Sequence, residues 1–256
     1  MSAVASLTAR PRRSASVRTG HPNSAGAPRP TVVFDLDGTL VDTAPDLAGS
    51  LNHCLTLAGL EPTTLAEVRP DAGRGAQAML RAAYARAGRP LPVDELAGQT
   101  ARFLEHYTAN IAEASTLYPG VALALDRLAA DGSILAVCTN KTEALAVRLL
   151  DALGLSPRFA AICGADTFAC RKPDPVHLHG TIDRAGGHRA HAVLVGDSET
   201  DMEAARRAFV PGILVSFGYD AGAPVRAMAS ATIDNFGELE PRLLDRLTSA
   251  FIPRPL

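Results

Sequence analysis

The second half of the chain alternates between helical and strand patterns, and this alternation constrains the fold more than any other feature. In each repeat, apolar residues at helical spacing are followed by a short apolar run. The expected helix and strand pairs are 121–130 with 133–138, 142–153 with 159–163, 175–186 with 191–196, and 199–208 with 213–216. This alternation is typical of parallel strands joined by helical crossovers. It predicts an α/β doubly wound parallel sheet, a Rossmann-like core.

A further buried strand is expected at the start of residues 31–42, where Thr-Val-Val-Phe runs directly into Asp35, Asp37 and Gly38. The two aspartates are two positions apart, so in an extended chain their side chains project to the same side. Their charges repel unless a cation lies between them or one carboxyl keeps a proton. The pattern therefore indicates a metal site, proton transfer or both, and its structural alternative is a common Asp-Gly turn.

Residues that could bind a phosphate group lie in two later segments, one directly after the strand at 133–138 and one in the turn around Lys172. Ligands of parallel α/β sheets bind beyond the carboxyl ends of the strands, so these positions are candidates for a site. Thr139, Asn140 and Lys141 follow the strand at 133–138 and precede a helix, an arrangement that suits an anion. Lys172 lies in a turn held rigid by prolines, and Lys141 and Lys172 are the only two lysines in the chain.

Two more carboxylates follow the strand at 191–196. Asp197 and Asp201 are four positions apart at the start of a helix, so they face the same way, toward the edge where Asp35 and Asp37 are expected. Carboxylates that converge without a cation would be strongly destabilising. The sequence therefore predicts a hard divalent cation with oxygen ligands, Mg²⁺, beside a place for a phosphate group.

In this order, the motifs resemble those of the haloacid dehalogenase superfamily of phosphatases. The motifs are Asp35-Leu36-Asp37-Gly38-Thr39, Thr139, Lys172 and Gly196-Asp197-x-x-x-Asp201. The segments most similar to the phosphoglycolate phosphatase branch are Thr139-Asn140-Lys141, Lys172-Pro173-Asp174-Pro175 and Phe217-Gly218-Tyr219. The resemblance covers roughly residues 31–240 and implies Mg²⁺-dependent hydrolysis of a small phosphate monoester, with 2-phosphoglycolate as the expected substrate.

The resemblance also implies a role for each site residue. Asp35 is expected to attack phosphorus and form an aspartyl phosphate, and Asp37 to act as general acid and base. Mg²⁺ is expected on the Asp35 carboxylate, the Asp37 backbone carbonyl and Asp197. Asp201 is expected to support this site, or to be an acid favoured by the helix dipole. The residues expected to bind phosphoryl oxygens are Thr139, Asn140 and Lys172.

Apolar residues recur at helical spacing from Leu47 to Ala58, and residues 60–115 lack a strand pattern and carry two further helical stripes. Residues 45–115 are expected to form a small helical cap, inserted into a core domain of residues 31–44 and 116–256. Within the cap, the turn Gly73-Arg74-Gly75 corresponds to a loop that reaches over the active site in similar phosphatases. We expect Arg74 to bind a substrate carboxylate through paired hydrogen bonds, and its alternative is an exposed turn arginine.

Other functions are compatible with parts of the pattern. Within the superfamily, the alternative is a phosphomutase or a phosphatase acting on a sugar phosphate. A non-catalytic module that binds a phosphorylated ligand is the alternative from another class, although binding alone needs neither Asp35 nor Asp37. A dehalogenase is disfavoured because its relatives lack the second aspartate, and a phosphonoacetaldehyde hydrolase because the cap contains no lysine.

The first 30 residues differ from the rest of the chain, with five arginines and no acid. We predict a disordered extension for residues 1–30, and a transit peptide or an upstream start site would fit equally. The formal charge of −2 then leaves about −7 on the remaining residues, so no nucleic-acid partner is expected. The expected partner is a small phosphorylated metabolite. We also expect no membrane association, a cytoplasmic location, free cysteine thiols, and a monomer or homodimer.

Four residues near the motifs are interpreted structurally. Lys141 is expected to be solvated at the start of its helix. His177 and His179 are expected on the surface, because their spacing places them on different faces of a helix. Phe209 stands where similar sequences usually have glycine, which predicts an unusual helix end or local strain.

Three further residues have open alternatives. The Thr39 hydroxyl is expected either to hold Asp37 or to brace the turn. Asp42 and Thr43 are expected either to cap the helix that follows them or to contact substrate.

Overall fold

The core of the protein is a parallel sheet of six strands. The computed structural model describes residues 29–250, so the predicted extension over residues 1–30 falls outside the described residues apart from its last two. Across the sheet, the strands are β5 (Ala161–Cys163), β4 (Ile134–Cys138), β1 (Thr31–Phe34), β6 (Ala192–Gly196), β7 (Gly212–Val215) and β8 (Ala231–Ile233). Every neighbouring pair is parallel, which confirms the predicted α/β doubly wound fold.

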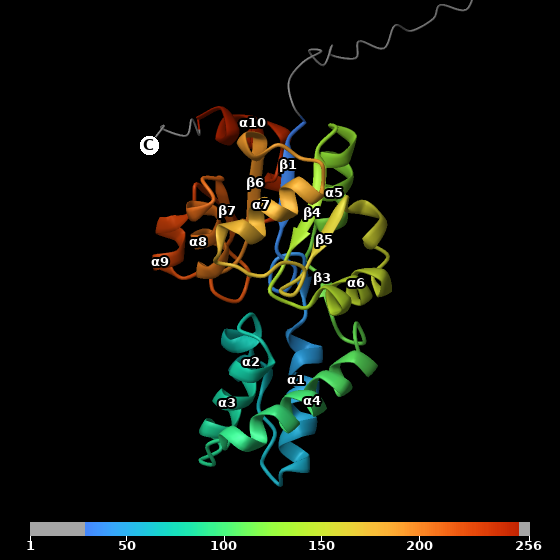
Figure 1. The fold of residues 1–256 in the computed structure, drawn as a ribbon, viewed down its shortest axis with the longest axis vertical. Coiled ribbons are helices and arrows are strands. Elements are labelled where there is room, and N and C mark those ends of the chain that lie inside the picture. Colours follow the sequence, from blue (N-terminus) through green and yellow to red (C-terminus); the bar gives the residue numbers. More distant parts are fainter. Residues whose placement is uncertain (1–28, 251–256) are drawn as a thin grey trace, which may run out of the picture.

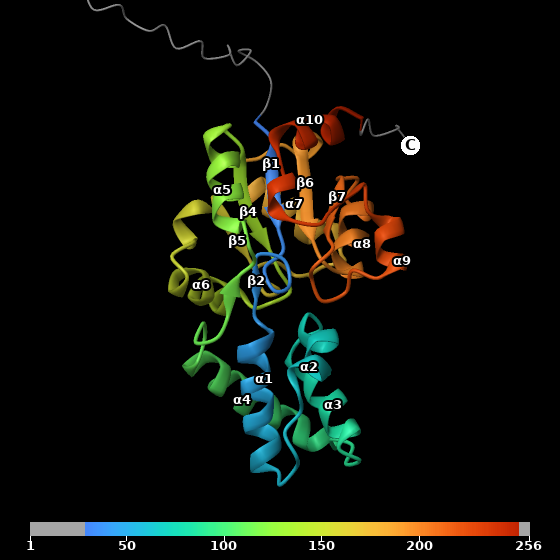
Figure 2. The same ribbon diagram turned by 180° about the vertical axis from the view of Figure 1, so that it is seen from behind.

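Strand β1 lies at the centre of the sheet and is completely buried. Val32 and Phe34 belong to the core on one face, with helices α5 (Val121–Ala130) and α10 (Pro241–Ala250). Val33 belongs to the core on the other face. Figure 1 shows α7 in front of the sheet and Figure 2, from behind, shows α10. Burial on both faces explains why this strand is an unbroken apolar run rather than an alternating one.

The crossover helices agree closely with the sequence pattern. They are α6 (Glu143–Ala152), α7 (Pro175–Arg184) and α8 (Glu199–Arg207), in addition to α5. The short helix α9 (Ala223–Met228), strand β8 and helix α10 were not predicted. The cysteines are free, as expected. Among residues 29–250, no helix combines the length and apolar character that crossing a bilayer requires.

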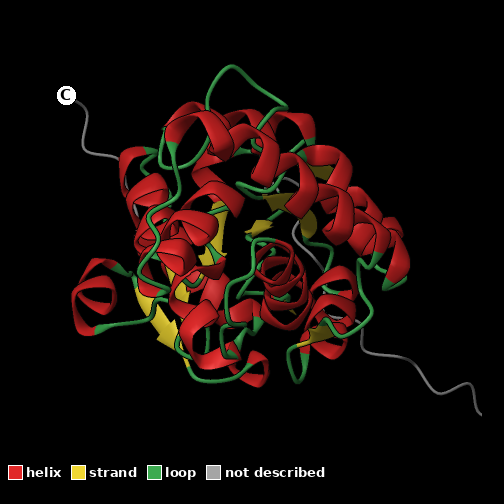
Figure 3. Cartoon of the chain, turned by 90° about the horizontal axis from the view of Figure 1, so that it is seen from below, coloured by secondary structure: helices red, strands yellow, loops and turns green. Residues whose placement is uncertain are grey.

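A group of four helices follows β1 and forms the cap. The helices are α1 (Ala44–Leu57), α2 (Leu65–Ala72), α3 (Ala76–Arg86) and α4 (Val93–Ala109). Their predicted stripes meet in a separate hydrophobic cluster that includes Leu51, Met79, Tyr84 and Phe103. Strands β2 (Val41–Asp42) and β3 (Thr116–Leu117) pair antiparallel where the chain enters and leaves the cap. Figure 1 shows the cap beyond the carboxyl ends of the core strands, and Figure 3 shows the helices around the sheet.

Helix α8 ends in an unusual way. Phe209, just after the helix, has a φ of 52°, in the left-handed region that glycine usually occupies. Its side chain is 59% exposed, so little packing compensates for this geometry. The structure therefore agrees with the expectation of local strain at this helix end.

Candidate active site

Asp35 is positioned by the central strand. Its N–H donates to the Val195 carbonyl at 2.8 Å, which extends the pairing of β1 with β6 by one residue. The chain then turns at Gly38, whose φ is 82°. A Cβ at Gly38 would lie 2.3 Å from Asp197 Oδ2, so only glycine lets the two acidic loops approach this closely.

Three carboxylates meet at the carboxyl ends of β1 and β6. One oxygen from each of Asp35, Asp197 and Asp201 lies within 4.8 Å of the others. Burial, followed by the negative charge of Asp201, raises the pKa of Asp35 to about 7 and the pKa of Asp197 well above its ordinary value. Lys172 is the ammonium in contact with the cluster, so three carboxylates face one cation. A divalent cation would balance the two remaining charges, and the donor set therefore fits one.

Asp197 is fixed through both of its oxygens. Thr39 Oγ1 donates to Oδ1 at 3.2 Å, and the Tyr219 N–H donates to Oδ2 at 2.7 Å. The two alternatives for Thr39 were to hold Asp37 or to brace the turn. Its hydroxyl instead donates to Asp197, a partner that neither alternative included. Gly218 makes the approach possible, since a Cβ there would lie 2.1 Å from the Cβ of Asp197.

Asp201 both caps a helix and faces the cluster. Its Oδ2 accepts hydrogen bonds from the Ser198 hydroxyl at 2.6 Å and from the Ser198 N–H at 3.1 Å, in a capping box at the start of α8. Its Oδ1 accepts from Lys172 Nζ at 2.6 Å. Because Asp201 is completely buried and both oxygens have partners, it is well placed to orient its neighbours.

Lys172 lies between two carboxylates and is almost fully buried. Its ammonium is 2.6 Å from Asp201 Oδ1 and 2.8 Å from Asp35 Oδ1, and its side chain is 2% exposed. Burial alone would lower the pKa of Lys172, but the charges of Asp201 and Asp35 outweigh it and raise the pKa above its ordinary value. The contact with Asp35 is an ion pair without hydrogen-bond alignment. Asp35 Oδ1 lies beside this ammonium but accepts no aligned hydrogen bond from the described residues.

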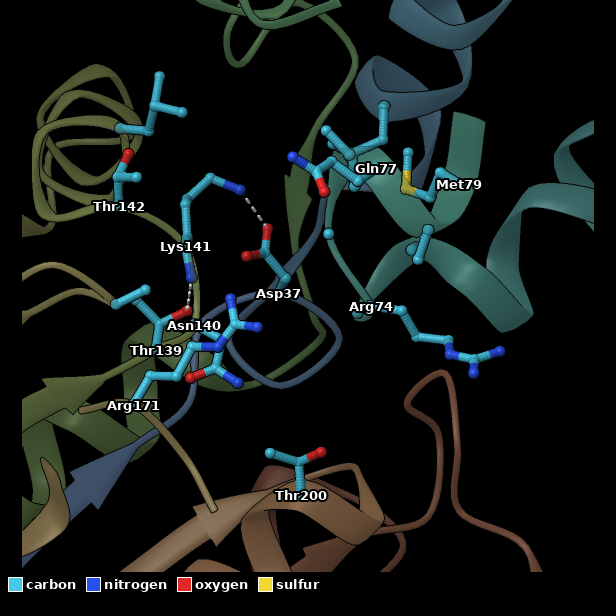
Figure 4. Close-up of a pocket in the computed structure, with 18 of the residues that line it drawn as sticks. Asp37, Arg74, Gln77, Met79, Thr139, Asn140, Lys141, Thr142, Arg171 and Thr200 are labelled. Atoms are coloured by element: carbon cyan, nitrogen blue, oxygen red, sulfur yellow. Dashed lines mark hydrogen bonds and ion pairs between the residues drawn. The ribbon is translucent and has the colours of Figure 1, made fainter. Parts of the chain in front are cut away.

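Asp37 stands apart from the cluster and has partners of its own. Its Oδ1 accepts from Thr43 Oγ1 at 2.6 Å and from Lys141 Nζ at 2.7 Å, as Figure 4 shows for the lysine. The expectation that Lys141 is solvated is wrong, since its side chain is 7% exposed. The ring of Tyr107, from α4 of the cap, covers the ammonium at 4.8 Å. Burial opposes the charge of Lys141, but Asp37 prevails and raises the pKa of the lysine.

Tyr219 connects the core with the cap. Its hydroxyl accepts from the N–H groups of Thr43 at 2.8 Å and Ala44 at 2.9 Å, at the start of α1. It donates to Asp42 Oδ1 at 2.9 Å, and Asp42 also pairs with Arg69 of α2 at 2.6 Å. Thr43 is the N-cap residue of α1 but makes no side-chain cap, and the alternative that Asp42 or Thr43 contacts substrate stays a prediction. The Phe217-Gly218-Tyr219 motif pointed to this residue in the sequence, but it did not predict that the Tyr219 hydroxyl connects the core with the cap.

Thr139 and Asn140 line the same cavity as Lys172, and Figure 4 shows them beside Lys141. Thr139 Oγ1 accepts from the Lys141 N–H at 3.1 Å, which leaves its own hydrogen free to donate. Asn140 Nδ2 donates to the Lys172 carbonyl at 3.0 Å, so the two loops are held together. Their expected contacts with phosphoryl oxygens stay a prediction.

A cavity of about 860 Å³ separates the core from the cap. Its core wall includes Asp35, Asp37 and Lys172, and its cap wall includes Arg74 and Arg81. The Arg74 side chain is 71% exposed, and its guanidinium lies 3.4 Å from a carboxylate oxygen of Asp71. Figure 4 shows its side chain directed away from Asp37. The expected binding of a substrate carboxylate by Arg74 stays a prediction.

The expectation that His177 is on the surface is wrong. This residue, in the first turn of α7, is completely buried, and its Nδ1 accepts from the Lys172 N–H at 3.1 Å. Burial and the charge of Lys172 lower the pKa of His177 to about 4. His179 is partly exposed, with Nε2 at 2.9 Å from the Ala208 carbonyl. Helical spacing separated the two histidines correctly, but did not show which one faces the interior.

Comparison with known proteins places this geometry in a family. Residues 32–215 match the family model described as haloacid dehalogenase-like hydrolase. The chain is 48% identical to a phosphoglycolate phosphatase of Agrobacterium fabrum over 86% of this chain and 94% of the relative. It is 47% identical to a phosphoglycolate phosphatase of Mesorhizobium japonicum over 87% of this chain and 98% of the relative.

A solved structure gives the same result. The crystal structure of a protein from Haemophilus somnus, described as a predicted phosphoglycolate phosphatase, superposes with a TM-score of 0.76 at 30% identity. The match covers 82% of this chain and 96% of that chain. The chain therefore belongs to the haloacid dehalogenase-like hydrolases.

Proposed function

We propose that this protein is a Mg²⁺-dependent phosphatase that hydrolyses 2-phosphoglycolate through an aspartyl phosphate on Asp35. One observation carries the proposal: Asp35 lies in a buried cluster of carboxylates with Lys172, while Asp37 is held separately by Lys141 and Thr43. Two neighbouring carboxylates in different environments can divide nucleophilic and proton-transfer work. The names of the relatives support 2-phosphoglycolate as the substrate.

The residues would act in two steps. In the first step, an Asp35 oxygen attacks phosphorus, the ester P–O bond breaks, and glycolate leaves with a proton from Asp37. In the second step, Asp37 takes a proton from water as the water oxygen attacks phosphorus. This releases inorganic phosphate and restores the Asp35 carboxylate. Throughout, Lys172, Thr139 and Asn140 hold the phosphoryl oxygens, and the ammonium of Lys172 balances part of their charge.

The cation is part of the proposal. Asp35, Asp197 and the Asp37 carbonyl would hold Mg²⁺, with Asp201 orienting Lys172 beside them. The bound ion would neutralise charge on the carboxylates and on the phosphoryl oxygens. Two observations support this assignment: Asp35 Oδ1 accepts no aligned hydrogen bond from the described residues, and the carboxylates of the cluster outnumber its ammonium group.

Substrate selection is assigned to the cap. A carboxylate at the end of a small phosphate ester would lie in the cavity between core and cap, where Arg74 can bind it after a rotamer change. The proposal includes a cytoplasmic location and a monomer or homodimer, which cell fractionation and light scattering test.

The discriminating experiment measures phosphate release from 2-phosphoglycolate and from sugar phosphates, with Mg²⁺ and with a chelator. We expect 2-phosphoglycolate to have the highest kcat/KM, the chelator to stop turnover, and Asp35→Asn to abolish it. A preference for a sugar phosphate would instead support the alternative within the family. Binding of 2-phosphoglycolate without phosphate release by the wild-type protein would support a binding module and overturn the proposal.

A further inference from the structure

His177 is a buried polar residue that the two catalytic steps do not use. It lies in the first turn of α7, and its ring meets the ring of Phe168 edge-on, with centroids 5.8 Å apart and an interplanar angle of 69°. Buried imidazoles usually have a hydrogen-bonding reason for their position. Here the reason is the backbone of Lys172, whose N–H donates to His177 Nδ1 at 3.1 Å.

This hydrogen bond completes the support of Lys172. The carbonyl of Lys172 accepts from Asn140 Nδ2 at 3.0 Å, so the residue is held on both sides of its backbone. Lys172 lies in a turn rather than in a helix or strand, where ladder hydrogen bonds would have fixed it. A long lysine side chain has many rotamers, and the position of its ammonium depends on a fixed backbone. His177 therefore supplies order that the local secondary structure does not.

The chemistry of the ring fits an acceptor role. Because Nδ1 accepts a hydrogen bond, the proton of the neutral imidazole is on Nε2, which has no hydrogen-bond partner among the described residues. Burial and the charge of Lys172 lower the pKa of His177, and they outweigh the Gly164 backbone and the charge of Asp174, which favour the charged ring. A lowered pKa of about 4 agrees with a neutral ring that accepts at Nδ1 near neutral pH.

We propose that His177 is a positioning residue for phosphate binding, which acts by holding the Lys172 N–H so that the lysine ammonium meets the phosphoryl oxygens. His177 itself touches neither the phosphate nor the cation. The inference rests on the proposed role of Lys172 and deepens it: the phosphate site includes a residue of α7 that acts only through the backbone.

Two amide variants test whether the hydrogen-bond acceptor at the position of Nδ1, rather than the imidazole ring as a whole, supports phosphate binding. In His177→Asn, the amide oxygen can occupy the place of Nδ1, whereas in His177→Gln it is displaced toward the place of Nε2. The probe is inorganic phosphate, titrated calorimetrically into the Mg²⁺-loaded protein. We expect His177→Gln to weaken phosphate binding about tenfold or more, as for a buried donor left unpaired, and His177→Asn to stay within about threefold of wild type. His177→Leu is a second variant without an acceptor.

The control variants make each outcome decisive. Lys172→Ala tests the proposed phosphate site itself: unchanged phosphate binding in that variant would overturn the proposed function. If Lys172→Ala loses binding while His177→Asn and His177→Gln behave alike, whether both bind or both fail, the positioning role is overturned. His179→Ala removes a histidine of the same helix whose Nε2 contacts the Ala208 carbonyl rather than Lys172, and should leave phosphate affinity unchanged.

Discussion

The ammonium of Lys141 lies 2.7 Å from Asp37 Oδ1 and 4.8 Å from the centroid of the Tyr107 ring. These three residues come from three parts of the chain: the loop after β1, the loop after β4, and helix α4 of the cap. The proposed acid and base is therefore held by a lysine that the cap covers. A cation over an aromatic face is attracted by about 0.5–2 kcal/mol, more when water is excluded.

Replacing Lys141 tests this arrangement. We expect Lys141→Met to lower kcat for 2-phosphoglycolate about ten- to hundredfold, because Asp37 loses its charged partner and one of its two hydrogen-bond donors. Steady-state kinetics at saturating Mg²⁺ measure the effect. Tyr107→Leu removes only the ring, so its effect should be smaller. An unchanged kcat in Lys141→Met would show that Thr43 alone orients Asp37.

The response to Mg²⁺ should depend on pH. The folded-state pKa of Asp35 is about 7, raised from 3.8, so the metal-free folded protein keeps a proton that the unfolded chain has lost. Without metal, this group makes the protein less stable as pH rises from the unfolded-state pKa of 3.8 through the folded-state pKa of about 7. Mg²⁺ binds the deprotonated form, so it should raise Tm more at pH 8 than at pH 5.5.

Thermal unfolding with Mg²⁺ and with a chelator checks this prediction. A ligand at a hundred times its Kd stabilises a protein by about 2.7 kcal/mol, which is readily measured. Asp197→Asn should abolish the response to Mg²⁺ at both pH values. Equal increases of Tm at pH 5.5 and pH 8 in wild type would contradict the prediction.

Arg74 should affect one class of substrate only. We expect Arg74→Ala to raise KM for 2-phosphoglycolate about tenfold, through loss of a charge-assisted hydrogen bond, and to leave a carboxylate-free ester such as p-nitrophenyl phosphate unchanged. Arg81→Ala is the matched control, since Arg81 lines the same cavity. If Arg74→Ala changes both substrates by the same factor, Arg74 does not select the carboxylate.

The Tyr219 hydroxyl should stabilise the junction of core and cap. Tyr219→Phe leaves the N–H groups of Thr43 and Ala44 without their acceptor, which we expect to lower the free energy of unfolding by about 1–3 kcal/mol. Urea denaturation measures the change. Tyr84→Phe is the control, because the buried Tyr84 hydroxyl has no hydrogen-bond partner in the described part of the chain. Equal losses in both variants would argue against a specific role for Tyr219.

The helix end at Phe209 should be improved by glycine. The left-handed conformation costs a residue with a Cβ about 1–2 kcal/mol, partly offset by the greater unfolded-state freedom of glycine. We expect Phe209→Gly to be more stable than Phe209→Ala by about 1 kcal/mol in urea denaturation. Alanine separates the backbone effect from removal of the exposed ring. If the two variants are equally stable, the position is not strained.

The carboxylates could be found without the structure for a specific reason. Asp35 follows the end of β1 and Asp197 the end of β6, and parallel strands bring these ends to one edge of the sheet. The parallel arrangement of the strands was therefore enough to predict that these carboxylates lie close together, without knowledge of the distances between them. The same reasoning brought Lys172 and Thr139 to that edge, and the apolar stripes of the cap predicted its separate core.

Sequence pattern by itself determined the alternation of helices and strands as far as β7, the helical insertion and the acids at the strand ends. It could do so because periodicity is a local property and the meeting of parallel strand ends follows from topology. Tertiary structure alone decided that Lys141 and His177 are buried and that Thr39 holds Asp197. Burial of a polar residue depends on what packs over it from elsewhere in the chain. Lys141 is covered by Tyr107 of the cap, and the sequence pattern around Lys141 contains no information about this distant residue.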